Sequence, residues 1–121
     1  MAVILLVEDT PANRALATKL LTAAGHEVIT ASTGTDGVRL VAERSPDLVL
    51  MDLGLPDIAG HEALREIRST APDHPGVKVI AFTAHAMVGD RERAMAAGFD
   101  GYLSKPIEFA TFARSVEALL P

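Results

Sequence analysis

Several short apolar runs of this sequence end in polar side chains that could bind a metal ion or a phosphoryl group. These side chains are three carboxylates, one hydroxyl and one ammonium, from Glu8, Asp9, Asp52, Thr83 and Lys105. Three carboxylates that face one another are unstable alone, because like charges disfavour joint ionisation. A hard divalent cation relieves this repulsion, and Mg2+ prefers a few carboxylate oxygens together with water and phosphate oxygens.

The hydroxyl and the ammonium of this set suit a phosphoryl group. Lys105 would supply a positive point charge, and Thr83 would offer a hydroxyl to a phosphate oxygen. Chemistry in such a site consists of positioning and charge neutralisation, and a carboxylate nucleophile would form an acyl phosphate. Each of these residues alone is more often a solvated loop or cap residue. The hypothesis therefore depends on their convergence at one place in the fold.

The elements that would bring these residues together alternate between strand and helix along the chain. Continuous apolar runs predict buried strands at residues 2–7 and 48–51, and further strands are predicted at residues 27–30, 77–82 and 100–103. Apolar residues at helical spacing follow each run, and the predicted helix caps are Thr10, Thr33 and Asp90. The last helix is predicted from its apolar residues Phe109, Phe112, Val116 and Leu119.

Strict alternation of five strands and five helices predicts an α/β fold with a doubly wound parallel sheet. In an open sheet of this kind, ligands bind outside the carboxyl ends of the strands. The polar residues named above follow those ends, so one edge of the sheet is predicted to carry the site. We expect a single domain over residues 1–121, with no output domain attached.

Composition and charge exclude several classes of function. The 121 residues are 49% hydrophobic and 22% charged, and the absence of cysteine excludes a disulfide scaffold, a cysteine-ligated metal and a thiol nucleophile. A net charge of −5 disfavours binding to nucleic acid or to an anionic membrane. No apolar run is long enough to span a membrane, and the N-terminus lacks the basic region of a signal peptide. We therefore expect a cytoplasmic, monomeric protein.

Other residues are predicted to have structural roles. The four histidines are expected to be solvated, although the last could lie at the rim of the site: His26, His61, His74 and His85. Three methionines are expected to fill the core or a helix: Met51, Met87 and Met95. Gly37 lies inside a predicted helix, where it costs about 1 kcal/mol relative to alanine, so a close packing contact is expected there.

Four segments of the chain resemble the motifs of response-regulator receiver domains of two-component signalling. They are residues 7–9, 50–56 with Gly60 after them, 81–84 and 101–106. The resemblance covers essentially the whole chain and includes every family-defining position. It implies a flavodoxin-like (βα)5 fold with the strand order 2-1-3-4-5.

The resemblance also implies how the acidic residues would be used. Asp52 would be the phosphoacceptor. Asp9 would bind Mg2+ directly, Glu8 would act mainly through water, and the backbone carbonyl of Gly54 would be the third protein ligand.

On the other side of the site, the resemblance implies a switch. Thr83 would follow the phosphoryl group, and Lys105 would form a salt bridge with it. The Lys105–Pro106 bond that follows this lysine resembles the family's cis peptide. Tyr102 would swing inward when Thr83 moves, although an aromatic residue in a strand is more often simply half-buried. The surface of the fourth helix, fifth strand and fifth helix would then change shape and bind a downstream protein.

Several alternatives stay open at the level of sequence. The implied phosphoryl donor is a histidine kinase or a histidine phosphotransfer protein, and the chain would lose the group slowly by itself rather than turn over as an enzyme. Residues 83–92 look like receivers of phosphorelays and hybrid kinases, so a stand-alone receiver and one cut from a longer kinase are both possible. A pseudo-receiver that binds partners without chemistry is a third reading. A nucleotide or flavin enzyme is disfavoured, because no P-loop or dinucleotide-binding loop is present.

Overall fold

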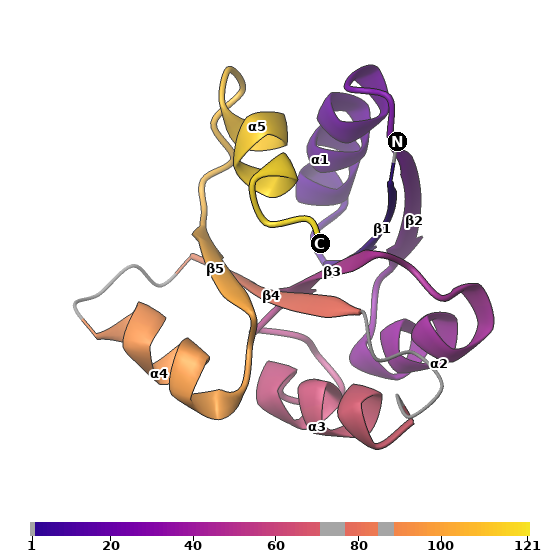
Figure 1. Cartoon of the computed structure of the whole chain (residues 1–121), viewed down its shortest axis with the longest axis vertical. Coiled ribbons are helices and arrows are strands. Elements are labelled where there is room, and N and C mark those ends of the chain that lie inside the picture. Colours follow the sequence, from indigo (N-terminus) through magenta and orange to yellow (C-terminus); the bar gives the residue numbers. More distant parts are fainter. Residues whose placement is uncertain (1, 71–76, 85–88) are drawn as a thin grey trace.

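The computed structural model describes residues 2–70, 77–84 and 89–121. Strands and helices alternate through these residues, and all strand pairs are parallel (Figure 1). The elements are β1 Val3–Val7, α1 Pro11–Ala23, β2 Glu27–Ala31, α2 Gly34–Arg44, β3 Leu48–Asp52, α3 Gly60–Thr70, β4 Lys78–Thr83, α4 Asp90–Ala97, β5 Gly101–Ser104 and α5 Phe112–Glu117. The sheet order is β2-β1-β3-β4-β5, which confirms the predicted doubly wound fold.

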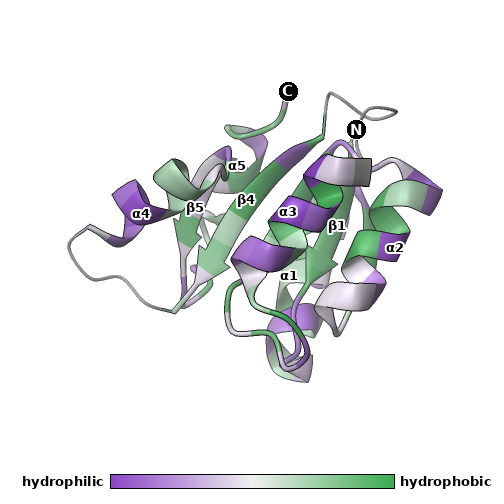
Figure 2. Cartoon of the chain, turned by 90° about the horizontal axis from the view of Figure 1, so that it is seen from below, coloured by the Kyte–Doolittle hydropathy of each residue, from purple (hydrophilic) through white to green (hydrophobic). Residues whose placement is uncertain are grey.

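Helices cover both faces of the sheet. In Figure 1, α1 and α5 lie over one face, and α2, α3 and α4 lie over the other. Successive strand residues point to opposite faces, so each strand contributes to two cores. Leu5 and Val49 belong to the core under α2 and α3, whereas Leu6 and Leu50 belong to the core under α1 and α5. Burial on both faces explains the unbroken apolar runs, seen as green strands in the middle of Figure 2.

Residues at the N-termini of α1 and α2 explain where these two helices begin. Pro11 begins α1 as predicted, and Thr10 holds the cap position without a side-chain cap bond. The hydroxyl of Thr33 accepts the N–H of Asp36 at the start of α2, as predicted. A Cβ added to Gly37 would lie 2.7 Å from Val7 Cγ2, so the predicted close packing contact is confirmed.

Two predictions about the C-terminal helices are wrong in detail. Asp90 is the first residue of α4 rather than its cap, because Gly89 takes the cap position in the left-handed conformation that glycine tolerates (φ 92°). Phe109 precedes α5 and is 68% exposed. The carbonyl of Glu108 accepts the N–H groups of Thr111 and Phe112, so this stretch forms a turn before the helix begins.

The predictions for histidine and methionine are mixed. His26 is buried rather than solvated, because Nδ1 accepts the N–H of Ala2 and Nε2 lies 2.9 Å from Oε2 of Glu117. Met51 is fully buried in the core and Met95 is a 43% exposed residue of α4, so both agree with the prediction that they fill the core or a helix. His61 is exposed as predicted, and the predictions for His74, His85 and Met87 lie outside the described residues.

No helix in the described ranges has the length and apolar character needed to cross a membrane.

Candidate functional site

The carboxyl ends of the four neighbouring strands β1, β3, β4 and β5 lie at one edge of the sheet. Glu8 and Asp9 follow β1, and Asp52 is the last residue of β3. Thr83 is the last residue of β4, and its carbonyl accepts the N–H of Lys105, which follows β5. The parallel register therefore brings the predicted residues to one edge, as expected for this class of sheet.

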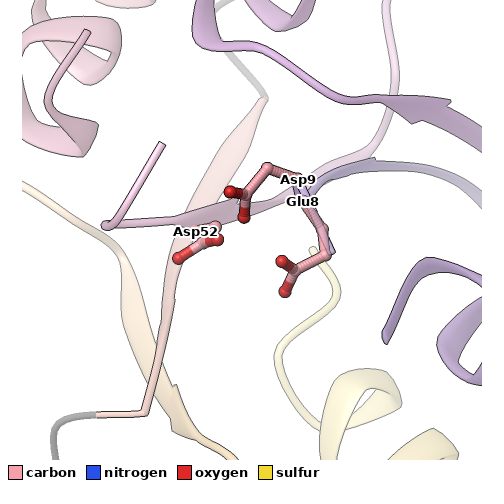
Figure 3. A group of neighbouring side chains, drawn as sticks. All are labelled: Glu8, Asp9 and Asp52. Carbon is pink, nitrogen blue, oxygen red and sulfur yellow. The ribbon is translucent and has the colours of Figure 1, made fainter. Parts of the chain in front are cut away.

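The three acidic side chains form one cluster. Glu8, Asp9 and Asp52 each place a carboxylate oxygen within 4.8 Å of the other two (Figure 3). Glu8 and Asp52 are buried, whereas Asp9 is exposed. In Figure 3 the side chains of Glu8 and Asp9 leave adjacent positions in different directions, and the carboxylates of Asp9 and Asp52 face each other. The cluster thus has a buried side at Glu8 and an open side at Asp9.

Lys105 supplies the positive charge of the site. Its Nζ lies 2.5 Å from Oε1 of Glu8 and 3.6 Å from Oδ2 of Asp52, so the ammonium pairs most closely with Glu8. The same Nζ lies 5.0 Å from the centre of the Phe82 ring, a favourable position for a cation over an aromatic face. The Lys105–Pro106 peptide bond is cis, which confirms that prediction.

The two buried carboxyl groups have opposite shifts in pKa. Burial raises the pKa of Asp52, whereas the hydrogen bond from the Gly54 N–H lowers it. The nearby charge of Glu8 raises it further, and the resulting pKa is about 6. Burial alone would also raise the pKa of Glu8, but the Lys105 ammonium and the Thr10 N–H outweigh it, and that pKa is lowered. Glu8 therefore stays ionised, whereas Asp52 carries a charge that its surroundings only partly stabilise.

Residues that the sequence did not indicate complete the buried side of the cluster. The backbone N–H of Thr10 donates to Oε2 of Glu8, and Nη1 of Arg14 donates to the Glu8 backbone carbonyl. A helix that begins at Pro11 places Arg14 in its first turn, close to the end of β1. That spacing could have indicated Arg14, but arginine in a first turn is usually solvated.

The donor set fits a hard divalent cation. Three carboxylates face one ammonium, so the cluster keeps an excess of negative charge at neutral pH. Oε1 of Glu8 is buried, and no hydrogen bond of regular geometry reaches it from the described residues, although Lys105 opposes its charge. Oxygen ligands with an open side at Asp9, where water can complete the coordination, are what Mg2+ prefers.

A cavity lies behind Thr83. Its volume is about 280 Å3, and it is lined by residues from β4, β5, α3, α4, the segment after β3 and the turn between α4 and β5, among them Thr83, Tyr102, Phe99 and Leu53. Tyr102 is half-buried, and burial together with the charge of Asp90 raises its pKa. Thr83 and Tyr102, which the sequence analysis paired, thus line the same cavity.

Comparison with known proteins places this architecture in a family. Residues 4–117 match the response regulator receiver domain. This chain belongs to the response regulator receiver domain family. The receiver is 36% identical over 117 residues to the polar-differentiation response regulator DivK of Brucella ovis, an alignment that covers 97% of this chain and 94% of that protein. DivK of Brucella anthropi matches to the same extent.

Solved structures agree with this assignment. The receiver domain of sensor histidine kinase PA1611 from Pseudomonas aeruginosa is 37% identical, with a TM-score of 0.85 over 98% of this chain and 96% of that one. That structure is described with a magnesium ion coordinated in its active site cleft. Chemotaxis protein CheY4 of Vibrio cholerae shares the fold, with a TM-score of 0.89, 24% identity and 99% of each chain covered.

Proposed function

We propose that this receiver accepts a phosphoryl group on Asp52 from a phosphohistidine of a histidine kinase or a histidine phosphotransfer protein. The observation that carries the proposal is the position of Asp52 at the end of β3, between Glu8, Asp9 and Lys105. A single carboxylate so placed is partly desolvated and close to a cation. Membership in the receiver family adds weight to the same role.

The transfer needs a nucleophile and charge neutralisation. An oxygen of the Asp52 carboxylate attacks phosphorus, a P–O bond forms, and the P–N bond to the donor imidazole breaks. The electron pair of that bond returns to the imidazole nitrogen, which takes a proton from solvent. Lys105, 3.6 Å from Asp52, offers its ammonium to the phosphoryl oxygens. Thr83 ends the neighbouring strand and would donate its hydroxyl to one of them.

A magnesium ion belongs to this proposal. Asp9, Asp52 and the backbone carbonyl of Gly54 would hold it, with Glu8 acting through water. The support in this chain is the oxygen cluster and its excess negative charge. When bound, Mg2+ neutralises charge on the transferring group. The PA1611 receiver, which holds magnesium in its cleft, is a related protein with the same fold.

The output of this receiver would be a change in protein binding. Thr83 and Tyr102 line one cavity, which gives Tyr102 a space to enter when Thr83 moves toward a phosphorylated Asp52. The surface of α4, β5 and α5 would change shape with Tyr102 and bind a downstream protein target. If this surface has two conformations in equilibrium, a change of about 1.4 kcal/mol in their free-energy difference changes the ratio of their populations tenfold.

The decisive experiment is labelling with a small phosphodonor in the presence of Mg2+. Wild type should gain the mass of one phosphoryl group, and hydroxylamine should remove it, as expected for an acyl phosphate. The variant Asp52→Asn should stay unlabelled. Asp36→Asn is the matched control, because Asp36 is an exposed aspartate of α2 whose carboxylate pairs with Arg39 rather than with a residue of the site, and it should label like wild type. Wild type that takes no label would favour a pseudo-receiver that only binds partners.

A further inference from the structure

The carboxylate of Asp57 binds the start of α2 from outside that helix. Oδ1 accepts the N–H of Gly34 at 2.8 Å. Oδ2 accepts the N–H of Thr35 at 2.9 Å and its hydroxyl at 2.7 Å. The first N–H groups of a helix lack partners within the helix, so a carboxylate placed there satisfies them and interacts well with the helix dipole. Asp57 is thus a cap supplied by a different segment of the chain.

Apolar packing accompanies these hydrogen bonds. A Cβ added to Gly34 would lie 2.5 Å from Cγ1 of Ile58 and 3.3 Å from Cδ1 of Leu55, so the segment after β3 rests directly on the α2 backbone. Both side chains also pack against the core under α2 and α3. Asp57 and its apolar neighbours therefore fix residues 53–59 on α2.

The fixed segment carries the metal side of the candidate site. It begins immediately after Asp52 and includes Gly54, whose N–H donates to Oδ1 of Asp52 at 2.9 Å. Its far end is held at Gly60, where an added Cβ would lie 2.6 Å from Leu53 Cδ2. Gly54 itself is exposed and has little packing of its own, since an added Cβ there would meet only Oδ1 of Asp52, at 3.7 Å.

We propose that Asp57 is a positioning residue for the metal, which holds the backbone of Gly54 in place by anchoring residues 53–59 to the start of α2. This inference rests on the proposed function, in which Gly54 supplies a carbonyl ligand. Asp57 does not act as a ligand, because its two oxygens already accept three hydrogen bonds. The partners of this carboxylate lower its pKa, chiefly the hydroxyl of Thr35, so the anchor is ionised at neutral pH.

Loss of the anchor should weaken metal binding without removing a ligand. A segment that spends only part of its time in the binding conformation raises the apparent Kd by the inverse of that fraction. We expect Asp57→Ala to raise the Kd for Mg2+ about fivefold. Thr35→Val, which removes only the hydroxyl bond, should raise it about twofold and serves as the milder variant.

The test compares these variants with Thr33→Ala by calorimetric titration with Mg2+ and by amide hydrogen exchange of the metal-free protein. Thr33 caps the same helix from within its own segment and makes no bond to residues 53–59, so its variant loses stability without releasing them. The proposal expects weaker Mg2+ binding and faster exchange at Gly34 and Gly54 in Asp57→Ala and, to a smaller degree, Thr35→Val. Thr33→Ala should bind Mg2+ like wild type.

Three results would overturn the proposal. Unchanged Mg2+ affinity in both Asp57→Ala and Thr35→Val, beside a wild type that binds, would refute the positioning role and leave the proposed function intact. Equal weakening by Thr33→Ala would reduce Asp57 to a helix cap without a special effect on the metal. A wild type that binds no Mg2+ would overturn the metal part of the proposed function, and the positioning role with it.

Discussion

Asp52 and Asp57 lie five positions apart in the chain and have opposite environments. Asp52 is buried beside Glu8, another carboxylate, and its pKa is raised to about 6. Asp57 is exposed and accepts three hydrogen bonds from Gly34 and Thr35, and its pKa is lowered. The negative charge of Asp52 is thus poorly stabilised, and a bound cation or a phosphoryl group would reduce this unfavourable energy. The charge of Asp57 is already stabilised by its hydrogen bonds.

The difference shows that the partners of a carboxylate decide its role. N–H donors at a helix start stabilise the charge of Asp57, so that side chain serves as an anchor. Around Asp52 one N–H donor and the more distant Lys105 oppose burial and the charge of Glu8. The electrostatically unfavourable surroundings of Asp52 therefore lie next to residues 53–59, which the hydrogen bonds of Asp57 hold in place. In our proposal this anchored segment supports the site at Asp52.

The largest effect is expected from removing the Lys105 ammonium, which lies close to both buried carboxylates, Glu8 and Asp52. Lys105→Met should lose about 3 kcal/mol of stability at pH 8 without metal, because Glu8 is left charged and buried. Glu8 has a lowered pKa in the folded protein, so the missing contribution is fully present above its ordinary value near 4.5 and fades as the pH falls from there through the lowered folded value. Denaturant unfolding at pH 8 and pH 4 measures the loss, and an equal loss at both values would contradict the ion pair as its cause.

Neutralising Asp52 should have the opposite effect. The raised pKa means that ionisation costs stability as the pH rises from about 4 to 6, and the cost persists above that range. Asp52→Asn should therefore be about 3 kcal/mol more stable than wild type at pH 8 without metal, because the net shift corresponds to that free energy and already includes the attraction to Lys105. Unfolding curves should converge near pH 4. A variant less stable than wild type at pH 8 would contradict the strained environment of Asp52.

Removal of the Asp57 carboxylate should destabilise the protein by a smaller amount. Asp57→Ala should cost about 1 kcal/mol at pH 7, the usual value for a lost helix cap, and solvent screening keeps the electrostatic part small. Here the folded pKa is lowered, so the contribution of Asp57 is present above the ordinary pKa of 3.8 and fades as the pH falls below it. Thermal unfolding from pH 7 to pH 3 follows this change. Asp57→Ala should thus lower the stability of the protein, whereas Asp52→Asn should raise it.

The smallest expected signal comes from Tyr102. The chain has one tyrosine and no tryptophan, so ultraviolet emission reports on that side chain. Phosphorylation with Mg2+ should change its emission or ring NMR signals as Tyr102 enters the cavity it shares with Thr83. Thr83→Ala should weaken the response when it is compared with wild type at the same degree of labelling of Asp52. Emission that stays constant in fully phosphorylated protein would show that output takes another route.

Much of the fold and of the acidic site could be predicted because their signals are local. Segments of four to six residues, the clearest of them unbroken apolar runs, indicate parallel strands, and the polar residue after such a segment indicates what lies at the carboxyl end. Right-handed crossovers leave few ways to arrange such a chain. The approach of Glu8, Asp9 and Asp52 follows from that arrangement, and the structure places them together.

Tertiary structure alone decided which partner each of these side chains obtains. The closer pairing of Lys105 with Glu8 than with Asp52, the burial of His26 against Glu117 and the anchoring of Asp57 to α2 all join segments far apart in the chain. Whether a hydrogen bond or ion pair forms depends on differences of a few tenths of an ångström in the distance between two atoms. The periodicity of strands and helices does not encode such differences. The sequence by itself therefore determined the fold and the gathering of acids at one edge, and three-dimensional packing determined which carboxylate is strained and which is satisfied.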